Sequence, residues 1–379
     1  MVEVRPVRTK KEIKEFLLFP WKIYRQDPNW VPPLIMDMKE KLDRKKHPFF
    51  EHASMELFLA REGKEVKGRV AAIIDELHNQ VHNEKIVFFG LFESVNDVEV
   101  ARALFEAASS WGWERGMNVL RGPMNLSMND ECGLLIEGFD SPPVIMMPYN
   151  PPYYVDLMEK SGLQKVKDLY AFYLSRDHEV MAKVKTIVER VKREMKVRLR
   201  TVDMGHLEEE ARKIQAIYNE AWSRNWGFVP WTENEMKHMV KRLKQFADPY
   251  LVIFAEDQEG RPIGFAFGLP NYNEILKKLN GRLTPWGIVL FLLARRRIKG
   301  MRAVVFGVVR DYQHSGLSYL LYSELEKNAL LRGYQWGEMS WELEDNEPIL
   351  RFSESIGGKI YKKYRIYQKA IEERRDSGI

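Results

Sequence analysis

An internal repeat constrains the fold of this chain more than any other feature. Residues 58–68 read FLAREGKEVKG and residues 254–264 read FAEDQEGRPIG, so both have an apolar start, a charged centre and a closing glycine. Each segment has the pattern of a strand, a tight turn and a second strand. Farther on, FFGLFE at 88–93 and VFGVVR at 305–310 are each followed by a helical pattern. The chain is therefore predicted to contain two copies of one fold in tandem.

Length and composition agree with two globular domains. The 379 residues exceed what one hydrophobic core usually organises, and 45% hydrophobic with 30% charged residues is typical of a globular protein. Cys132 is the single cysteine, which excludes an intramolecular disulfide, and no basic-then-apolar leader opens the chain, so a cytoplasmic location is predicted. No uninterrupted apolar stretch is long enough to span a bilayer. The net charge of +5 favours anionic ligands slightly and is too small to indicate nucleic acid.

The segment 306–318, FGVVRDYQHSGLS, predicts an anion-binding turn between a strand and a helix. Residues 303–309 are apolar and rich in valine, and residues 318–331 carry apolar side chains at helical spacing. The backbone N–H groups between them would point outward at the start of the helix, where a diphosphate binds well. Gly316 would let a phosphate approach the backbone closely, and Ser318 is small enough not to block it. The predicted binding residues are Gln313, His314, Ser315, Gly316, Leu317 and Ser318.

The order of elements around this turn resembles that of the GNAT superfamily of acyl-CoA N-acyltransferases. The matching motif residues are Gln313, Gly316 and Ser318 in the turn, Asn346 after the next strand, and Gly357 at the end of the last helix. The resemblance covers residues 197–369. Its expected elements are a strand at 197–202, helices at 207–222 and 232–246, strands at 250–256 and 262–269, then after the turn a helix at 318–331, a strand at 337–343, a helix at 347–356 and a strand at 359–369.

The resemblance implies an α/β (α+β) fold of two tandem GNAT-like domains, each with a mixed, mainly antiparallel sheet flanked by helices. The expected division is a degenerate domain at 1–175, a connecting helix at 176–196, and a domain with the acyl-CoA site at 197–379. Aligning the two repeats places Glu99 where Gly316 stands and Ala101 where Ser318 stands. A carboxylate repels a diphosphate, so acyl-CoA is expected to bind once per chain, in the second half.

The chemistry implied by the resemblance is attack of an acceptor amine on the thioester of acetyl-CoA or of a longer acyl-CoA, with acetyl as the expected acyl group. An amine is mostly protonated at neutral pH, so a base must take its proton. Glu338, Glu342 and Glu344 are predicted to share one strand face through the two-residue period. Glu342 and Glu344 are the candidate bases, and Glu344 lies nearest the turn at Asn346.

Four further site residues follow from the resemblance. The backbone groups of Val308 and Val309 would pair with the pantetheine arm, and the N–H of Val309 would polarise the thioester carbonyl. Asn346 is expected to bind the same cofactor. Ser353 stands where many GNAT enzymes have a tyrosine that protonates the leaving thiolate. Because serine is a poor acid, its hydroxyl is expected only to hydrogen-bond the sulfur or a water.

Two other features leave alternatives open. His78 and His82 stand at i, i+4, but one pair without a third ligand is a poor metal site, so no metal is predicted. Residues 283–299, LTPWGIVLFLLARRRIK, run apolar and then basic. This segment could be an interfacial helix that contacts an anionic membrane or covers an acyl chain, or it could pack between domains with its arginines in water.

The acceptor is not readable from the sequence beyond a small-molecule or peptide amine. The aromatic segment 222–231 either borders the acceptor site or caps the core. Two alternative functions remain. One is a Fem-like transferase that uses aminoacyl-tRNA, for which the modest basic charge leaves room although nucleic acid is not expected. The other is a non-catalytic acyl-CoA-binding protein, suggested by Ser353 and the degenerate first half.

Overall fold

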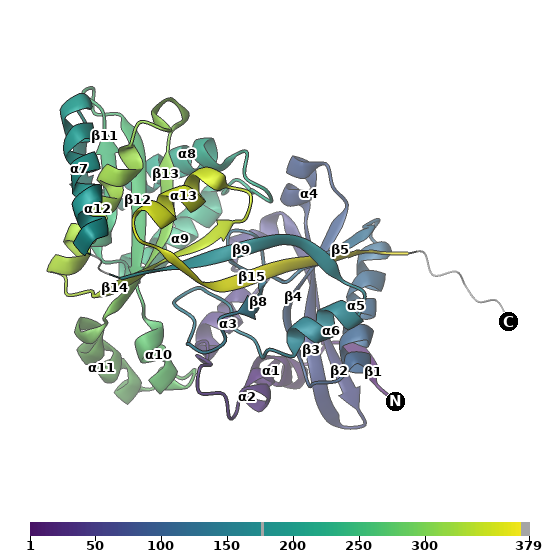
Figure 1. The fold of residues 1–379 in the computed structure, drawn as a ribbon. Coiled ribbons are helices and arrows are strands. Elements are labelled where there is room, and N and C mark those ends of the chain that lie inside the picture. The colour runs from purple at the N-terminus through teal and green to yellow at the C-terminus, as the bar shows by residue number, and fades with distance from the viewer. Residues whose placement is uncertain (176–177, 373–379) are drawn as a thin grey trace. The chain divides into compact units, whose positions relative to one another are not determined.

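The structure of the protein is a computed structural model that describes residues 1–175 and 178–372 (Figure 1). The chain forms two compact units. Unit one contains Met1–Leu169, Asn280–Arg282 and the segment that begins at Lys363, and unit two contains Tyr170–Leu279 and Leu283–Lys362. These units differ from the predicted division at 1–175, 176–196 and 197–379, because strands β9 (Gln164–Leu174) and β15 (Lys359–Ala370) each contribute residues to both units.

Unit one is built on a mixed sheet with the strand order β1-β2-β3-β4-β5-β15-β9. The pairs β1–β2, β2–β3, β3–β4 and β5–β15 are antiparallel, and β4 with β5 is parallel. Its other strands are β1 (Glu3–Pro6), β2 (Ala53–Glu62), β3 (Glu65–Asp75), β4 (Ile86–Ser94), β5 (Val119–Gly122), β6 (Met124–Asn125), β7 (Glu131–Cys132) and β8 (Leu134–Glu137). Its helices are α1 (Lys10–Leu18), α2 (Pro20–Ile23), α3 (Ile35–Lys41), α4 (Glu76–His82), α5 (Val98–Trp113) and α6 (Tyr154–Lys160).

Unit two has the strand order β9-β14-β13-β12-β11-β10. Its strands, besides the shared ones, are β10 (Arg198–Thr201), β11 (Val252–Glu256), β12 (Pro262–Pro270), β13 (Gly300–Val308) and β14 (Trp336–Leu343). Its helices are α7 (His178–Glu194), α8 (Leu207–Trp222), α9 (Glu233–Phe246), α10 (Asn273–Leu279), α11 (Pro285–Ala294), α12 (Leu317–Leu331) and α13 (Glu347–Ser355). The elements predicted between 197 and 369 are thus confirmed to within a few residues. Among the described residues, no helix is both long and apolar enough to cross a membrane.

Different helices cover the two faces of the unit-two sheet. A Cβ added to Gly264 of β12 would lie 3.2 Å from Leu317 Cδ2 of α12. A Cβ added to Gly307 of β13 would lie 2.6 Å from Phe265, the next residue of β12, and 3.1 Å from Ile217 of α8. Because successive strand residues point to opposite faces, α12 covers one face and α8 the other.

Helix α7 lies alongside α12 and belongs to the core of unit two (Figure 1). Its buried residues Val184, Val188 and Val191 recur at helical spacing, as expected for a helix with one buried face. The predicted connecting helix at 176–196 is therefore a packed element of the second unit. Residues 176 and 177 lie outside the described residues.

Strands β13 and β14 pair over only part of their length. They are parallel and in register from Gly300 opposite Trp336 to Ala303 opposite Met339. Beyond Ala303, β13 stays paired with β12 on its other edge as far as Val308. The parts of β13 and β14 beyond Ala303 and Met339 are called the β13–β14 opening below.

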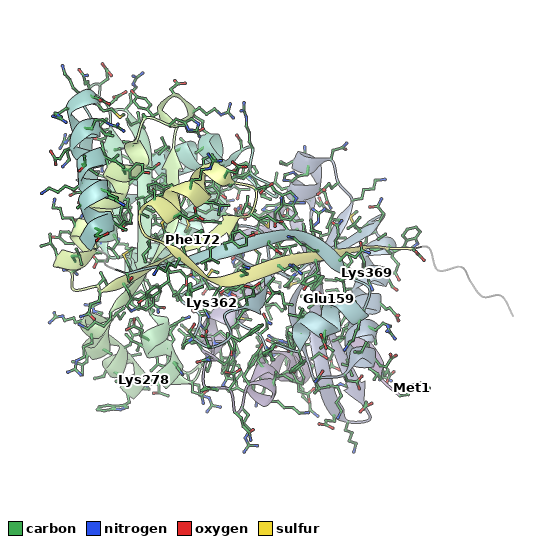
Figure 2. All side chains as sticks on the ribbon, in the orientation of Figure 1. Met1, Glu159, Phe172, Lys278, Lys362 and Lys369 are labelled. Carbon is green, nitrogen blue, oxygen red and sulfur yellow. The ribbon has the colours of Figure 1, made fainter. Side chains whose placement is uncertain are left out.

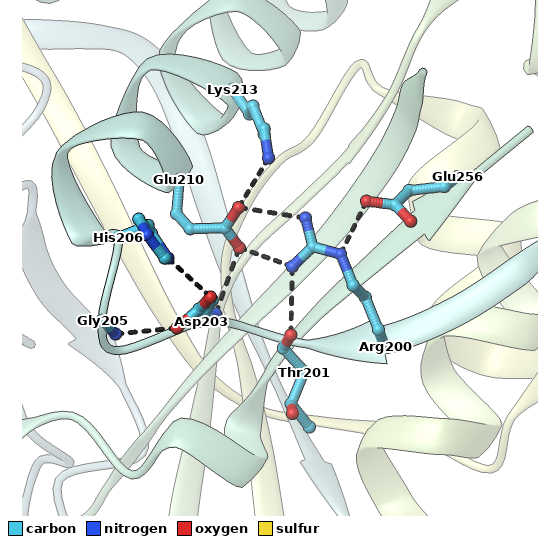
Figure 3. Close-up of polar contacts among 8 residues, drawn as sticks. All are labelled: Arg200, Thr201, Asp203, Gly205, His206, Glu210, Lys213 and Glu256. Atoms are coloured by element: carbon cyan, nitrogen blue, oxygen red, sulfur yellow. Dashed lines mark hydrogen bonds and ion pairs between the residues drawn. The ribbon is translucent and has the colours of Figure 1, made fainter. Parts of the chain in front are cut away.

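A charged network ties the edge strand β10 to the start of α8 (Figure 3). The guanidinium of Arg200 donates to Glu256 at 2.6 Å and to Glu210 at 3.0 Å, and Lys213 donates to Glu210 at 2.7 Å. Burial alone would raise the pKa of Glu210, but the hydrogen bonds from Arg200 and Lys213 outweigh it and hold that pKa below its usual value. The network fixes α8, which lies against the strand of the candidate site.

Candidate active site

The turn between β13 and α12 presents a partial ring of backbone donors. His314 and Gly316 both have positive φ, 67° and 87°, so the backbone alternates in the manner of an anion-binding nest. Of the six N–H groups predicted to point outward, three are used within the turn: Gln313 donates to Arg310 O, Ser315 to Tyr312 O, and Leu317 to Ser315 Oγ. In the described part of the chain no acceptor is recorded for the N–H groups of His314, Gly316 and Ser318. These three are the donors that remain for a phosphate.

Gly316 is needed for a reason that the sequence did not reveal. A Cβ at this position would lie 2.6 Å from Val191 Cγ2 of α7, so the missing side chain makes room for a neighbouring helix. The prediction that Gly316 clears space for a phosphate is therefore corrected, because the side-chain direction of this glycine faces α7. Gly357 is similar, since its Cβ position lies 3.3 Å from Val180 of the same helix. Helix α7 thus rests on both motif glycines.

We expect Gly316→Ala to lower the free energy of unfolding by about 2–3 kcal/mol, because positive φ costs roughly 1–2 kcal/mol and the Val191 contact adds to it. Urea denaturation measures the loss. Gly333→Ala is the matched control, because Gly333 has φ 91° and no atom within 4 Å of its Cβ position. It should lose only about 1–2 kcal/mol.

A double-mutant cycle between Gly316→Ala and Val191→Ala isolates the contact. A coupling energy near zero, or equal losses at Gly316 and Gly333, would show that Val191 does not restrict Gly316.

The backbone of β13 places Val308, rather than Val309, at the opening. The N–H of Val309 donates to Ile263 O at 3.0 Å, so the predicted polarisation of a thioester carbonyl by this N–H is wrong. Val308 stands opposite Gly264 in the antiparallel pair and its backbone groups therefore point away from β12, toward the opening. Its carbonyl accepts a 3.4 Å contact from Gln313 Nε2, which brings two predicted binding residues together.

In unit one, other parts of the chain occupy the positions that are equivalent to the predicted CoA-binding groups of unit two. Leu91 of β4, the counterpart of Val308, donates its N–H to Asn125 Oδ1 at 2.8 Å, and a Cβ on Gly90 would lie 1.7 Å from Met124 O. The first turn of α5 is capped by the side chain of Asp97, which accepts the N–H of Glu99. By contrast, the N-cap Gly316 of α12 has no side chain to cap its helix. Segment β6 thus occupies the slot in unit one, and a carboxylate occupies the helix start.

Glu342 and Ser353 meet at the opening. Ser353, fully buried on α13, donates its hydroxyl to Glu342 Oε1 at 2.7 Å. Glu342 Oε2 is buried, and no hydrogen-bond partner is recorded for it among the described residues. Burial raises the pKa of Glu342 to about 8, although the Ser353 hydrogen bond opposes the rise. Ser353 is therefore a partner of this carboxyl group, and its predicted hydrogen bond to the leaving sulfur or a water stays a prediction.

The other two predicted glutamates have different surroundings, and β14 ends at Leu343, before Glu344, so the predicted strand face with three carboxylates is wrong. Glu338 is fully buried and accepts hydrogen bonds from Ser340 and from Tyr361 of β15. Burial raises its pKa, while the charge of Arg302 opposes the rise. Glu344 follows the last residue of β14 and is only half-buried. The geometry favours Glu342 over Glu344 as the base.

Asn346 begins α13 as its N-cap, and its side chain makes no capping hydrogen bond. Its amide is therefore not used by the helix that it begins. The residue follows β14 closely, at the same end of the strand as Glu342. This position suits the predicted contact with a pantetheine arm, which stays a prediction.

A largely apolar cavity begins at the closed end of the β13–β14 opening. Its enclosed volume is about 60 Å³, and the cavity opens to solvent. Ala303 and Met339, the last paired residues of the two strands, line it together with Tyr322 and Leu325 of α12. Sequence reasoning missed this cavity because its lining residues have the spacing of ordinary core residues.

The aromatic segment 222–231 is divided between two roles. Trp222 donates its indole N–H to Phe306 O at 3.3 Å, which places it against β13 beside the opening. Trp231 stacks on Tyr218 of α8 with ring centroids 4.5 Å apart. Trp231 thus caps the core, and an acceptor contact of Trp222 stays a prediction.

The histidine pair of α4 is held by contacts with neighbouring side chains. His78 and His82 have ring centroids 4.5 Å apart, and His78 Nε2 lies 3.2 Å from Glu84 Oε2. Burial lowers the pKa of His78 to about 4. Over residues 1–175 and 178–372, no group of three or more His, Cys, Asp or Glu side chains is placed to hold a metal.

Comparisons with known proteins place the chain among relatives of known sequence and structure. No family model matches the chain. The bacterial ceramide synthase of Caulobacter vibrioides is 37% identical over 379 aligned positions, which cover 98% of each chain. YghO of Escherichia coli is 36% identical over 376 positions, which cover 97% of this chain and 95% of YghO.

Solved structures show the same fold. A tandem GNAT protein from the clavulanic acid biosynthesis pathway superposes with a TM-score of 0.60 at 13% identity, over 98% of this chain and 99% of that one. A GCN5-related N-acetyltransferase from Sphaerobacter thermophilus gives a TM-score of 0.53 at 13% identity, over 98% and 96% of the two chains. The predicted tandem GNAT fold is confirmed. Because identity is 37% and 36% along nearly the whole of both chains, this chain, which has the tandem GNAT fold, belongs to the family that includes the bacterial ceramide synthase and YghO.

Proposed function

We propose that this protein transfers a long acyl chain from CoA to the amino group of a long-chain amino alcohol, forming the amide of a ceramide-like lipid. The observation that carries the proposal is the cavity that begins at Ala303 and Met339, at the closed end of the β13–β14 opening. A thioester bound along β13 would direct its acyl chain to this end. The similarity to a bacterial ceramide synthase supports the class of acceptor. Of the two donors that the resemblance implies, acetyl-CoA and a longer acyl-CoA, we propose the longer one.

Unit two has donors suited to CoA. The N–H groups of His314, Gly316 and Ser318 suit the diphosphate, because they lie at the start of a helix whose N-cap residue, Gly316, has no side chain to accept them. The backbone groups of Val308 suit the pantetheine arm, as their counterpart at Leu91 already binds an amide oxygen. CoA supplies the acyl group as an activated thioester. Unit one is proposed not to bind it, because Asn125 and Asp97 fill the equivalent positions.

Glu342 is the proposed base. Its Oε1 is held by Ser353, which leaves Oε2 to take a proton from the acceptor amine. The amine nitrogen then attacks the thioester carbonyl carbon, so that the C–N bond forms and the C–S bond breaks. The sulfur leaves with the electron pair of the C–S bond. It then takes the proton that Glu342 received from the amine, which gives free CoA thiol. A pKa near 8 suits this task, because a base is most effective when its pKa lies close to the working pH.

The test is turnover with paired donors and acceptors. Purified protein is incubated with acetyl-, octanoyl- or palmitoyl-CoA, each with sphinganine or with a lysine peptide, and both free thiol and amide product are measured. We expect equal amounts of thiol and N-acyl sphinganine, with the rate rising with acyl length. Preference for acetyl-CoA and the peptide would overturn the lipid assignment. Binding of acyl-CoA without turnover, or turnover of aminoacyl-tRNA instead, would overturn the reaction.

A further inference from the structure

We infer that helix α11 and the basic residues around it form a docking surface for an anionic lipid membrane. The surface is defined by the exposed apolar side chains of Trp286, Leu292 and Leu293 and by the arginines 295–297. Its exposure and its charge do not depend on the proposed reaction.

The apolar side chains of α11 divide into an anchored face and an exposed face. Phe291 is partly buried, stacks on Tyr272 with ring centroids 5.4 Å apart and meets Phe246 edge-on at 6.3 Å. Gly287, one turn earlier on the same face, is buried. These contacts fix the helix to the start of α10 and the end of α9. On the opposite side of α11, the side chains of Trp286, Leu292 and Leu293 are not covered by the described residues of unit two.

The exposed face is unusually apolar. Trp286 is 76% exposed, Leu293 70% and Leu292 50%, and Ile288 and Val289 are exposed as well. Large apolar residues gathered on one short helix mark an interaction site, whereas single exposed residues need no explanation. A helix of 10 residues is about 15 Å long, half of what a bilayer core requires, so α11 can lie in the interface but cannot span it.

The positive charge around α11 favours an anionic partner. Residues 271–300 contain seven Lys or Arg and one acidic residue, Glu274, so their charge of +6 exceeds the +5 of the whole chain. Arg295, Arg296, Arg297 and Lys299 follow α11 and are exposed, and Lys278 on neighbouring α10 is exposed too (Figure 2). The carboxylate of Glu274 accepts the N–H groups of Lys299 and Gly300 and so serves the backbone. Two copies of such a surface would repel one another, whereas an anionic lipid surface attracts it.

The experiment is co-sedimentation of the full chain with vesicles of phosphatidylcholine alone or mixed with phosphatidylglycerol. The wild type should sediment with the mixed vesicles and weakly with the neutral ones. The double variant Trp286→Ser with Leu293→Ser should lose at least about tenfold in partition coefficient, because two large apolar side chains no longer enter the interface. The triple variant Arg295→Gln, Arg296→Gln and Arg297→Gln should lose on the order of 100-fold on mixed vesicles and little on neutral ones.

Matched controls lie on other helices of unit two. Leu331→Ser removes an apolar side chain that is 75% exposed at the end of α12, and a triple change of Lys183, Lys185 and Arg190 to Gln removes three exposed charges from α7. Neither control should change sedimentation by more than about twofold. Equal sedimentation of the wild type and both α11 variants would overturn the inference. So would a lipid-free dimer that Trp286→Ser with Leu293→Ser converts to monomer, because a second copy would then cover this face.

Discussion

Replacing Glu342 with glutamine is expected to lower the turnover number by about 10²- to 10⁴-fold, the usual contribution of a positioned general base. The amide keeps the size of the side chain and can still accept from Ser353, but it cannot take a proton from the acceptor amine. Affinity for acyl-CoA should not change, because no predicted CoA contact uses this carboxyl group. Single-turnover kinetics with palmitoyl-CoA and a long-chain amine measure the chemical step directly.

Glu344→Gln is the matched control, since Glu344 is a glutamate two residues later that lies past the end of β14. Its turnover should stay within about threefold of the wild type. If Glu344→Gln caused the larger loss, the base would lie in the turn beyond β14, and the buried position of Glu342 would be structural.

The pH profile follows from the same residue. Burial raises the pKa of Glu342 to about 8, so at neutral pH most molecules hold the protonated, inactive carboxyl. Turnover should rise as pH increases through about 8, and Glu342→Gln should keep only the titration of the amine itself. The Ser353 hydrogen bond lowers this pKa, so its loss in Ser353→Ala should move the profile to higher pH. A profile that does not move would mean that Ser353 only fills space.

Much of the fold was readable because each half carries complete local signals. The strand-turn-strand repeats and the helix after each apolar strand appear where their periodicities predicted them, and α8 has the predicted bounds of 207 and 222. Of the candidate site, only the parts formed by residues close together in the sequence could be predicted. The turn at Gln313–Ser318 is local, and Glu342 with Ser353 comes from one strand-helix pair.

The features that the sequence predicted wrongly or missed depend on contacts between segments that lie far apart in the chain. Whether Val308 or Val309 faces the opening is set by the pairing of β13 with β12, which shifts register between Phe267 and Gly268. The role of Gly316 depends on Val191, which is 125 positions away in a helix whose periodicity alone also fits a connector. The cavity depends on where β13 and β14 cease to pair. No residue type marks any of these three features.

The contact between Gly316 and Val191 also decides which substitution best tests the CoA site. A glutamate at Gly316, copied from Glu99 of the first half, would collide with Val191, so lost binding would not distinguish repulsion from a displaced α7. Ser318, the second residue of α12, avoids this problem. Ser318→Asp should stabilise the helix, because a carboxylate in the first turn interacts favourably with the helix dipole.

In the presence of CoA the same carboxylate should be strongly unfavourable. At separations near 4 Å a like-charge pair in a partly exposed site costs several kcal/mol, so calorimetric titration should show a loss of affinity on the order of 100-fold or more. Ser318→Asn has nearly the same shape without the charge and should stay within about threefold of the wild type. The penalty should shrink with added salt, as expected for repulsion between exposed charges. Equal affinities for the Asp and Asn variants would place the diphosphate away from the start of α12, and the similarity of this turn to a phosphate-binding loop would then reflect only the packing of Gly316 against α7.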